Sequence, residues 1–451
     1  MSGYAEYREV NLPWLKAVPA HWEIRRNKNI FTEQKEIVGE RSADYTLLSL
    51  TLNGIIPRDM DGGGKFPESF DKYKIVKNGD MAFCLFDIDE TPRTVGLSGY
   101  NGMLTGAYTI MRVSNINARF IYYYYLALDN GKMLRPLYTG LRKTININTF
   151  QSTKVPVPPR EEQDQIVRFL DWKVSGINKL INIKKKEIKA IDALKRSMVS
   201  HAITRGLTTD APMKYSGVKW LGDIPAHWKV TKLRQILHPV SEKNHPEFPL
   251  LSVVREQGVI LRDVEDKEAN HNFIPDDLSG YKVVRKGQFA MNKMKAWQGS
   301  YGVSDYTGIV SPAYFIFDIA FENLEYFHYA IRSKVYVNFF AQASDGIRVG
   351  QWDLQMDKMK EIPFIVPPAD EQIAIVKYIK QALPQYDAAI EKLTEEVAVL
   401  EEYKNKVIAD AVTGKIDVRG IEIPEYEFVD EDNDNVDENL EQGADEPPEE
   451  E

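Results

Sequence analysis

The sequence predicts an α+β fold built as an internal repeat: two modules with short strands, joined by a long antiparallel two-helix coiled coil with approximate two-fold symmetry. Three observations support this prediction. A long helical pattern occurs twice, the segments before the two patterns share short phrases, and the linker between the first helix and the second module is short.

The helical pattern covers residues 155–207 and recurs 209 positions later. Its apolar residues lie three, four or seven positions apart, which is the spacing of one helix face. A helix over residues 160–205 is about 65 Å long, which is more than a small domain covers, so we expect the two apolar faces to pack on each other rather than each on its own module. The apolar positions are Ile166, Leu170, Ile177, Ile181, Ile188, Ile191, Leu194, Met198 and Ala202 in the first copy, and Ile375, Ile379, Tyr386, Ile390, Val397, Leu400, Tyr403, Val407 and Ala411 in the second.

The direction of the two helices follows from the linker. Residues 205–220 join the end of the first helix to the second module, and about 15 residues span at most about 50 Å. A parallel pair requires this linker to return nearly the full helix length, whereas an antiparallel pair lets the second module begin where the first helix ends. Two features interrupt the pattern: the lysines at 184–186 weaken the apolar seam, and Pro384 is expected to kink or restart the second helix.

The repeat divides the chain into five segments. They are the first module (1–154), the first helix (155–207), the second module (208–361), the second helix (362–419) and an acidic tail (420–451). Within the first module, the predicted strands are 47–51, 77–83 and 107–113, and 122–126 is a predicted apolar helix whose tyrosines fill the core. Gly206 fits the C-terminal cap of the first helix.

The two modules share phrases but not loops. Pro-Ala-His-Trp opens both residues 19–24 and residues 225–230, and residues 73–79 resemble residues 281–287. The loops differ: residues 61–65 and 84–102 have no counterpart in 264–272 or 292–302. Because loops usually supply recognition surfaces, two loop sets on one scaffold predict that the modules recognise different targets.

Composition and charge exclude several classes of protein. Cys84 is the only cysteine, which excludes disulfides within the chain and cysteine-ligated zinc and indicates a reducing cytoplasm; no metal site is expected. No apolar run is long enough for a membrane span. Of the 66 acidic residues, 15 follow Arg419, which leaves 51 against 57 basic residues in the rest of the chain. A weakly basic body is compatible with a polyanionic partner, and the composition of the tail is typical of disorder.

The phrases in residues 1–419 resemble those of the specificity subunits of type I restriction-modification enzymes. The resemblance rests on the duplicated Pro-Ala-His-Trp, on a proline pair followed by Glu-Gln at 162–163 and 371–372, and on the Gly-Leu-Arg and Gly-Ile-Arg phrases at 140–142 and 346–348. It implies two target-recognition domains that each read half of an asymmetric, bipartite duplex DNA site, with the helices as the spacer. It also implies modification (methyltransferase) subunits and a restriction subunit as partners, which carry out adenine methylation and cleavage. S-adenosylmethionine, ATP and Mg are then expected on those partners and no cofactor is expected in this chain.

Catalytic motifs are missing from the sequence, so no catalytic residue is assigned. The proline pairs at 158–159, 367–368 and 447–448 lack the preceding Asn or Asp that an adenine methyltransferase needs, and no Gly-Lys pair continues into the Ser or Thr of a nucleotide-binding loop. Two alternatives stay open. A stand-alone DNA methyltransferase or nuclease is disfavoured by the missing motifs, and a structural coiled-coil adaptor does not need two loop sets.

Candidate DNA contacts are basic and small polar side chains near glycines in predicted loops. Arginine can bind guanine, Asn and Gln can bind adenine, and Lys neutralises phosphate, although any one of these residues is also compatible with an ordinary solvated surface position. In the first module they are Arg58, Lys65, Arg93, Thr94, Arg142, Lys143, Asn146 and Asn148, and in the second Arg255, Arg262, Lys293, Lys295, Gln298, Arg348 and Gln351. Candidate partner contacts at the helix starts are Glu161, Glu162, Gln163, Glu371 and Gln372.

Overall fold

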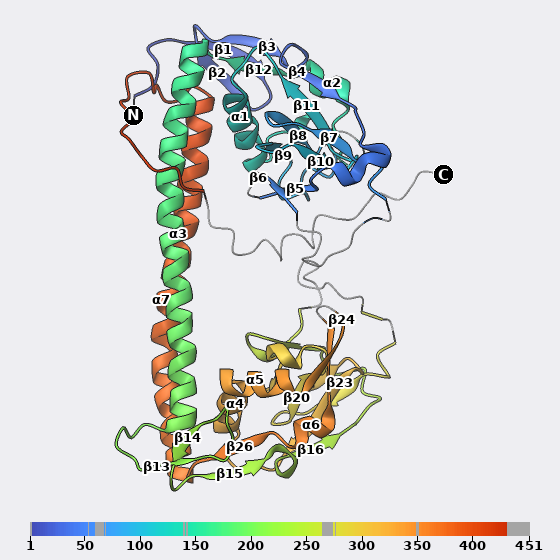
Figure 1. Cartoon of the computed structure of the whole chain (residues 1–451), viewed down its shortest axis with the longest axis vertical. Helices are drawn as coiled ribbons and strands as arrows, with labels where there is room; N and C mark the ends of the chain where they lie inside the picture. Colours follow the sequence, from blue (N-terminus) through green and yellow to red (C-terminus); the bar gives the residue numbers. More distant parts are fainter. Residues whose placement is uncertain are drawn as a thin grey trace. The chain divides into compact units, whose positions relative to one another are not determined.

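The computed structural model describes residues 2–52, 54–58, 67, 69–138, 140, 143–263, 274–275, 277–348 and 351–430. The chain forms two compact units: unit 1 is Met1–Glu187 with Leu393–Glu451, and unit 2 is Ile188–Lys392. Each unit therefore combines one module with the beginning of one long helix and the end of the other (Figure 1).

The two long helices are α3 (Arg160–Arg205) and α7 (Ala369–Val412). α3 ends before Gly206, whose φ of +74° is the left-handed conformation expected of a C-terminal cap. α7 continues across Pro384, so the predicted restart of this helix is wrong. Pro384 is exposed, and the carbonyl that loses its helical partner there can bind water instead. No helix in the described part of the chain is both long enough and apolar enough to cross a membrane.

The two helices pack together in opposite directions (Figure 1), which confirms the predicted antiparallel pair. In unit 1, Ile166 near the start of α3 shares a core with Ala411 near the end of α7. In unit 2, Ile203 near the end of α3 shares a core with Ile379 near the start of α7. Lys184 is accommodated beside the seam because its Nζ lies 2.8 Å from a carboxylate oxygen of Glu396.

The two modules contain matching strands and helices. The first has β1 (Tyr7–Leu12), β2 (Leu15–Pro19), β3 (Glu23–Arg26), β4 (Phe31–Gln34), β5 (Leu48–Thr51), β6 (Gly54–Pro57), β7 (Lys74–Val76), β8 (Asp80–Phe83), β9 (Val95–Leu97), β10 (Gly102–Leu104), β11 (Thr109–Val113), α1 (Ala118–Asn130), α2 (Ile147–Ser152) and β12 (Lys154–Val157). The second has β13 (Met213–Tyr215), β14 (Asp223–Pro225), β15 (Lys229–Lys232), β16 (Leu237–Val240), β17 (Leu251–Val254), β18 (Gly258–Leu261), β19 (Lys282–Val284), β20 (Phe289–Asn292), β21 (Tyr301–Val303), β22 (Gly308–Val310), β23 (Tyr314–Ile319), α4 (Leu324–Arg332), α5 (Lys334–Gln342), β24 (Ser344–Arg348), β25 (Gln351–Leu354), α6 (Met356–Lys360) and β26 (Pro363–Val366).

The sheet topology confirms that one scaffold is used twice. Each module has a central four-stranded sheet, in the order β4-β11-β8-β9 in the first and β16-β23-β20-β21 in the second. Around it, β1-β2, β3-β12, β5-β6 and β7-β10 correspond to β13-β14, β15-β26, β17-β18 and β19-β22. Among the described residues, the β24-β25 hairpin has no counterpart in the first module. The predicted strand over 77–83 is shorter than expected, because 77–79 form the turn before β8.

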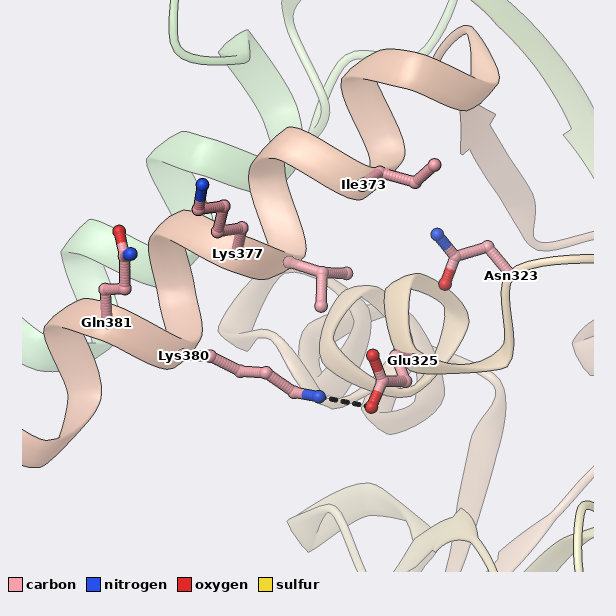
Figure 2. Close-up of a pocket in the computed structure, with 7 residues that line it drawn as sticks. Asn323, Glu325, Ile373, Lys377, Lys380 and Gln381 are labelled. Atoms are coloured by element: carbon pink, nitrogen blue, oxygen red, sulfur yellow. Dashed lines mark hydrogen bonds and ion pairs between the residues drawn. The ribbon is translucent and has the colours of Figure 1, made fainter.

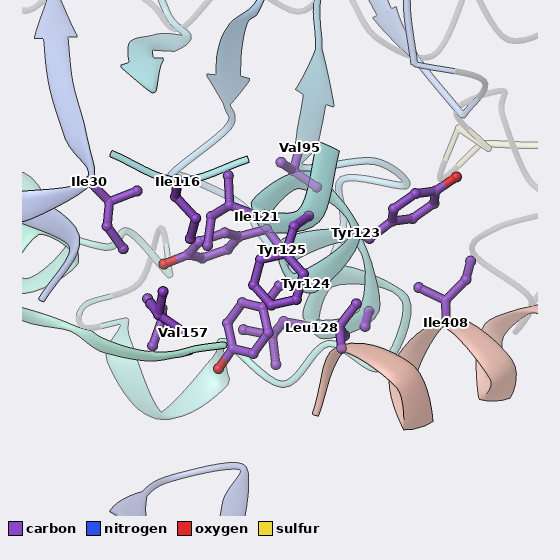
Figure 3. Packing of buried hydrophobic residues seen from close by; sticks show 14 of the residues in the cluster. Ile30, Val95, Ile116, Ile121, Tyr123, Tyr124, Tyr125, Leu128, Val157 and Ile408 are labelled. Carbon is purple, nitrogen blue, oxygen red and sulfur yellow. The ribbon is translucent and has the colours of Figure 1, made fainter. Parts of the chain in front are cut away.

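The core of the first module is built on helix α1. Tyr124 and Tyr125 are fully buried, and Figure 3 shows them among aliphatic side chains, with Ile408 of α7 nearby. Their hydroxyls are satisfied internally: Tyr125 donates to Asn27 Oδ1 (2.8 Å), and Tyr124 accepts from Trp14 Nε1 (2.8 Å). The tyrosine run therefore fills the core, as predicted, and joins the module to the helical pair.

The acidic tail differs from the prediction. Disorder was expected from residue 420 onward, but residues 420–430 are described and lie along α3, where Gln165, Ser175, Asn178 and Asn182 donate hydrogen bonds to backbone carbonyls of this segment. Composition describes only the acidic side chains of this segment, whereas its backbone is bound by polar side chains on a face of α3.

Candidate nucleic-acid interface

Arg93 and Thr94 lie in an internal polar cluster at the end of α1. Asp129 is 1% exposed and accepts hydrogen bonds from Thr94 Oγ1 (2.7 Å), Thr94 N (3.0 Å) and Arg93 Nη1 (3.1 Å). Lys132 Nζ adds a fourth contact at 3.0 Å. Thr94 is itself only 2% exposed. These two candidates therefore hold the start of β9 against α1, and Arg93 is the one of the two that also donates outside the cluster, to Asn130 Oδ1 (2.7 Å).

Two loops of the first module meet around Asp89. Lys143 Nζ lies 3.3 Å from Asp89 Oδ2 and also contacts Glu90, while Arg135 Nε donates to Asp89 Oδ1 at 2.9 Å. Desolvation of Asp89 acts in the opposite direction, but hydrogen bonds from Tyr138, Arg135 and Lys143 together lower the pKa of its carboxyl. The ion pairs of Lys143 therefore hold its own loop against residues 87–91. Cations and carboxylates alternate on the resulting surface.

The remaining candidates of the first module differ in role. Asn146 caps α2, since its side chain accepts from Asn148 N at 2.8 Å. Asn148 is exposed on the same turn. Arg58 follows β6, and its backbone N–H donates to Leu47 O (2.9 Å). Lys65 and Arg142 lie outside the described residues.

In the second module, the segment after β20 meets the β24-β25 hairpin. Lys293 Nζ lies 2.9 Å from Asp353 Oδ1, and Lys295 is exposed beside it. Between Lys295 and the partly buried Gln298 is Trp297, whose ring lies 5.7 Å from that of Trp352. The side chains of Arg348 and Gln351 are outside the described set.

The two tryptophans are site residues that the sequence reasoning missed. The signal was present, because Trp297 alternates with basic and amide residues over 293–298, and such interleaving is typical of nucleic-acid surfaces. The partner ring of Trp352 comes from a hairpin about 55 residues away along the chain, and no local pattern predicts that contact.

Two further arginines of the second module belong to the β17-β18 hairpin: Arg255 lies in its turn and Arg262 follows its second strand. Arg255 is exposed and pairs with its neighbour Glu256 at 3.3 Å. Its backbone carbonyl is held by Arg332 Nη2 (2.9 Å), which fixes the turn. Arg262 follows β18 and is partly buried. The structure therefore places the second module's described candidates on two surfaces, one at this hairpin and one at residues 293–298.

The predicted partner contacts at the start of α3 are mainly internal. Glu162 is 5% exposed and accepts from Tyr4 Oη (2.5 Å) and Trp22 Nε1 (2.9 Å), with His21 Nε2 at 2.8 Å. Burial, together with the hydrogen bond to Glu162, raises the pKa of Tyr4. Gln163 Nε2 donates to Pro158 O (2.8 Å). Glu161 alone among the three is exposed.

The start of α7 repeats this set of contacts between a module and the start of its long helix, here called the joint. Glu371 accepts from Trp228 Nε1 (2.9 Å) and contacts His227 Nε2 (2.5 Å), while Gln372 Nε2 donates to Pro367 O (2.8 Å). The shared Pro-Ala-His-Trp and Glu-Gln phrases are therefore explained physically: in each unit the His-Trp pair binds the glutamate. The glycine that follows the end of the other helix lies close to each tryptophan, because a Cβ on Gly206 would lie 3.1 Å from Trp228 and a Cβ on Gly414 would lie 3.2 Å from Trp22.

Comparison with known proteins agrees with the resemblance drawn from the sequence. A family profile described as "Type I restriction modification DNA specificity domain" matches residues 70–190. The type I restriction enzyme MjaVIII specificity subunit of Methanocaldococcus jannaschii is 24% identical over 446 residues, covering 92% of this chain and 98% of the relative. The putative type I restriction enzyme MjaX specificity subunit of the same organism is 23% identical over 435 residues, covering 89% and 95%.

The fold has a counterpart among solved structures. A chain from a study of complex assembly and conformational transition of the type I R-M system aligns with a TM-score of 0.55 at 13% identity, covering 88% of this chain and 99% of that one. At this identity the likeness shows the fold alone. The profile and the curated relatives agree with the resemblance drawn from the duplicated phrases, and the solved structure agrees with the predicted fold.

Proposed function

We propose that this chain, a relative of the type I restriction specificity subunits, is the DNA sequence-recognition subunit of a type I restriction-modification complex. It reads a bipartite, asymmetric duplex target and directs the adenine methylation and cleavage that its partner subunits perform. The observation that carries the proposal is the combination of one duplicated scaffold with two unlike loop sets, attached to one antiparallel helical pair.

The unlike loops supply different contact chemistry. The first module offers Lys143 and Asn148, and the second offers Lys295, Gln298 and an aromatic pair. Amide side chains can read adenine edges and lysines neutralise phosphates. Two identical modules related by a two-fold axis would read a palindrome, so unlike modules favour an asymmetric target with two different half-sites.

The partners supply the chemistry. We assign no catalytic residue to this chain, and S-adenosylmethionine, ATP and Mg bind to the modification and restriction subunits in this proposal. The helical pair is the docking platform: the exposed Glu161 reaches the modification subunit, whereas Glu162, Gln163, Glu371 and Gln372 shape the surface through their internal bonds. The complex acts in the cytoplasm, where its DNA target is.

The test compares the purified chain with and without its modification subunit. We expect weak retention of the lone chain on duplex DNA, because its slight excess of basic residues outside the tail gives little nonspecific affinity. The complex should bind tightly and methylate a split target in long-read methylation mapping. Tight sequence-specific binding by the lone chain, or binding of S-adenosylmethionine to it, would favour the stand-alone enzyme instead. A complex that methylates without any fixed target would favour the structural adaptor.

A further inference from the structure

Residues 420–430, here called the strap, follow α3 over more than four turns. Gln165 Nε2 donates to Val418 O (3.1 Å) and Ile421 O (2.8 Å) where the strap begins. Further along, Asn178 Nδ2 donates to Val429 O (3.2 Å) and Asn182 Nδ2 donates to Asp430 O (2.9 Å). The contacts continue to the end of the described chain, so the strap is bound along its length rather than at one point.

Ser175 makes a two-way contact at the centre of this row. Its hydroxyl donates to Glu427 O (2.9 Å) and accepts from Val429 N (2.7 Å). This pairing of one N–H and one C=O resembles the way a neighbouring β-strand would bind the strap. The helix face therefore binds the backbone of the strap and not its side chains.

The row is a polar feature that the strap covers. Ser175, Asn178 and Asn182 are spaced by three and four residues, which places them on one helix face, and they are 2%, 6% and 5% exposed. An amide or hydroxyl buried without a hydrogen bond destabilises a fold by about 1–3 kcal/mol. The strap backbone satisfies all three side chains.

Side chains of the strap complete the contact with the first module. Ile421 and Ile423 pack against the core of unit 1. Further along, the Phe428 ring lies 5.6 Å from the guanidinium of Arg119 on α1, and Arg119 in turn binds Asp171 of α3 at 2.7 Å. The strap thus contacts both α1 and α3.

Most of the strap's own side chains face solvent. Glu422, Glu425 and Glu427 are exposed, and Phe428 is 51% exposed. A segment held mainly through its backbone, with its charges outward, behaves more like a bound peptide than like part of a core. Such segments are recognised by their extended conformation and by a few anchor side chains.

The matching place in unit 2 shows that the binding of the strap is not a by-product of the repeat. There, α4 and α7 border an open pocket of about 330 Å³ lined by Asn323, Glu325, Ile373 and Lys380 (Figure 2). Here the long helix carries the cation, Lys380, and the module helix carries the carboxylate, Glu325. In unit 1 the long helix carries the carboxylate, Asp171, and the module helix carries the cation, Arg119. The residues 209 positions after Ser175, Asn178 and Asn182 are Pro384, Asp387 and Glu391. None of the three donates to a carbonyl, so a strap has no backbone-binding row in unit 2.

We propose that the surface formed by the facing sides of α1 and α3 is a peptide-binding site for an extended segment of this chain's own C-terminus, residues 420–430, which binds reversibly as a ligand tethered in cis. The same segment supplied in trans can occupy the site when the tethered copy is missing. The proposal does not depend on DNA recognition and stands if the chain has another function.

The first test uses the full-length chain and limited digestion by a Glu-specific protease. A bound strap resists cleavage after Glu425 and Glu427, and release exposes both bonds. We expect Asn178→Ala combined with Asn182→Ala to increase the cleavage rate at these positions by at least about tenfold, since two hydrogen bonds from buried amides are lost. Lys179→Ala, at an exposed position on the same helix, is the matched control and should leave the rate unchanged. Equal rates in all three proteins would overturn the proposal.

The second test measures binding in trans. A fluorescein-labelled peptide of residues 420–430 is titrated into the chain truncated after Arg419, with fluorescence anisotropy as the readout and circular dichroism to verify folding. We expect saturable binding to the truncated chain and at least about tenfold weaker binding to the full-length chain, because its site is occupied. A scrambled peptide should bind more weakly than the native peptide, because Ile421, Ile423 and Phe428 no longer stand at their anchor positions. If the truncation unfolds unit 1, truncation after Pro424 retains Ile421 and Ile423, and the peptide becomes 425–430. A folded truncated chain that ignores the peptide, or equal binding to both chains, contradicts the proposal.

Discussion

The two joints between module and helix are built from the same phrases but differ in how far they are closed. In unit 1 the carboxylate of Glu162 is 5% exposed and has three donor groups around it, one of them from Tyr4. In unit 2 the side chain of Glu371 is 34% exposed and has two. The difference comes from the chain ends, because the N-terminal Tyr4 and the residues after α7 cover only the first joint. The repeat therefore conserves which residues meet, while the segments outside the repeat decide how strongly each joint is held.

A second contrast concerns the helix that each module places against the long pair. α1 and α4 occupy equivalent positions, yet the ion pair that each makes has the opposite sense: Arg119 with Asp171 in unit 1, and Glu325 with Lys380 in unit 2. If α1 packed on the start of α7, Arg119 would meet Lys380, and if α4 packed on the start of α3, Glu325 would meet Asp171. Either arrangement brings like charges together. The two halves are thus distinguishable chemically, and this provides a means of making the chain fold with each module on its own helix start.

The largest expected effect separates the two joints. Glu162→Ala leaves the hydroxyl of Tyr4 and the indole N–H of Trp22 buried without a partner, and we expect a loss of about 3–5 kcal/mol in the free energy of unfolding of unit 1. Glu371→Ala should cost unit 2 about 1–2 kcal/mol, since water can reach the groups it leaves. Urea unfolding followed by unit-specific tryptophan signals measures both. Equal losses would show that the solvent exposure of the glutamate does not affect how much it stabilises its unit.

The next effect is an acid sensitivity of unit 2 that comes from one buried histidine, His328. Burial lowers the pKa of His328 to about 4, whereas in unit 1 the matching position is Tyr122. Because the folded state resists protonation, the unfolded state binds more protons below its pKa of about 6.5. Stability is therefore fully present above about pH 6.5 and declines as the pH falls toward 4, by at most about 3 kcal/mol.

Thermal unfolding at several pH values tests this expectation. His328→Gln should flatten the decline in unit 2. His238→Gln, at an exposed position on β16, is the control and should not. An unchanged pH profile in the His328 variant would show that other groups cause the acid sensitivity.

A smaller effect tests the assignment of each module to one half-site. We expect Lys295→Ala with Gln298→Ala to weaken binding of the assembled complex by about 1–3 kcal/mol and to relax selectivity in one half-site only. Asn148→Ala should do the same to the other half-site. Methylation mapping of both variants is the measurement. Relaxation of both half-sites by either variant would mean that the modules do not read separately.

The smallest effect concerns the tail. Truncation after Arg419 removes the strap but none of the candidate DNA contacts, so the methylated sequence should stay the same. We expect at most a modest loss of stability, confined to unit 1, where Ile421 and Ile423 pack. A truncated chain that methylates different sequences would place the tail in readout.

The sequence predicted the large features because they are periodic or duplicated. Apolar spacing located α3 and α7 to within a few residues, and the linker length gave their direction. Contacts between distant segments were not predictable: the burial of Thr94 against Asp129, the pairing of Trp297 with Trp352 and the binding of the strap to Ser175 all depend on tertiary packing. The restart expected at Pro384 does not occur, because local propensity ignores an exposed site on a long, well-packed helix.

The most direct test of the central claim is to shorten the helical pair in register. The contacts of Lys184 with Glu396 and of Lys195 with Asp387 identify facing positions, so removing residues 186–192 from α3 and 389–395 from α7 deletes one heptad from each helix and keeps both ion pairs. This shortens each helix by about 10 Å, close to three base pairs of duplex. Methylation mapping of the assembled variant should find both half-sites unchanged and the spacer between them shorter. Altered half-sites with an unaltered spacer would contradict the account.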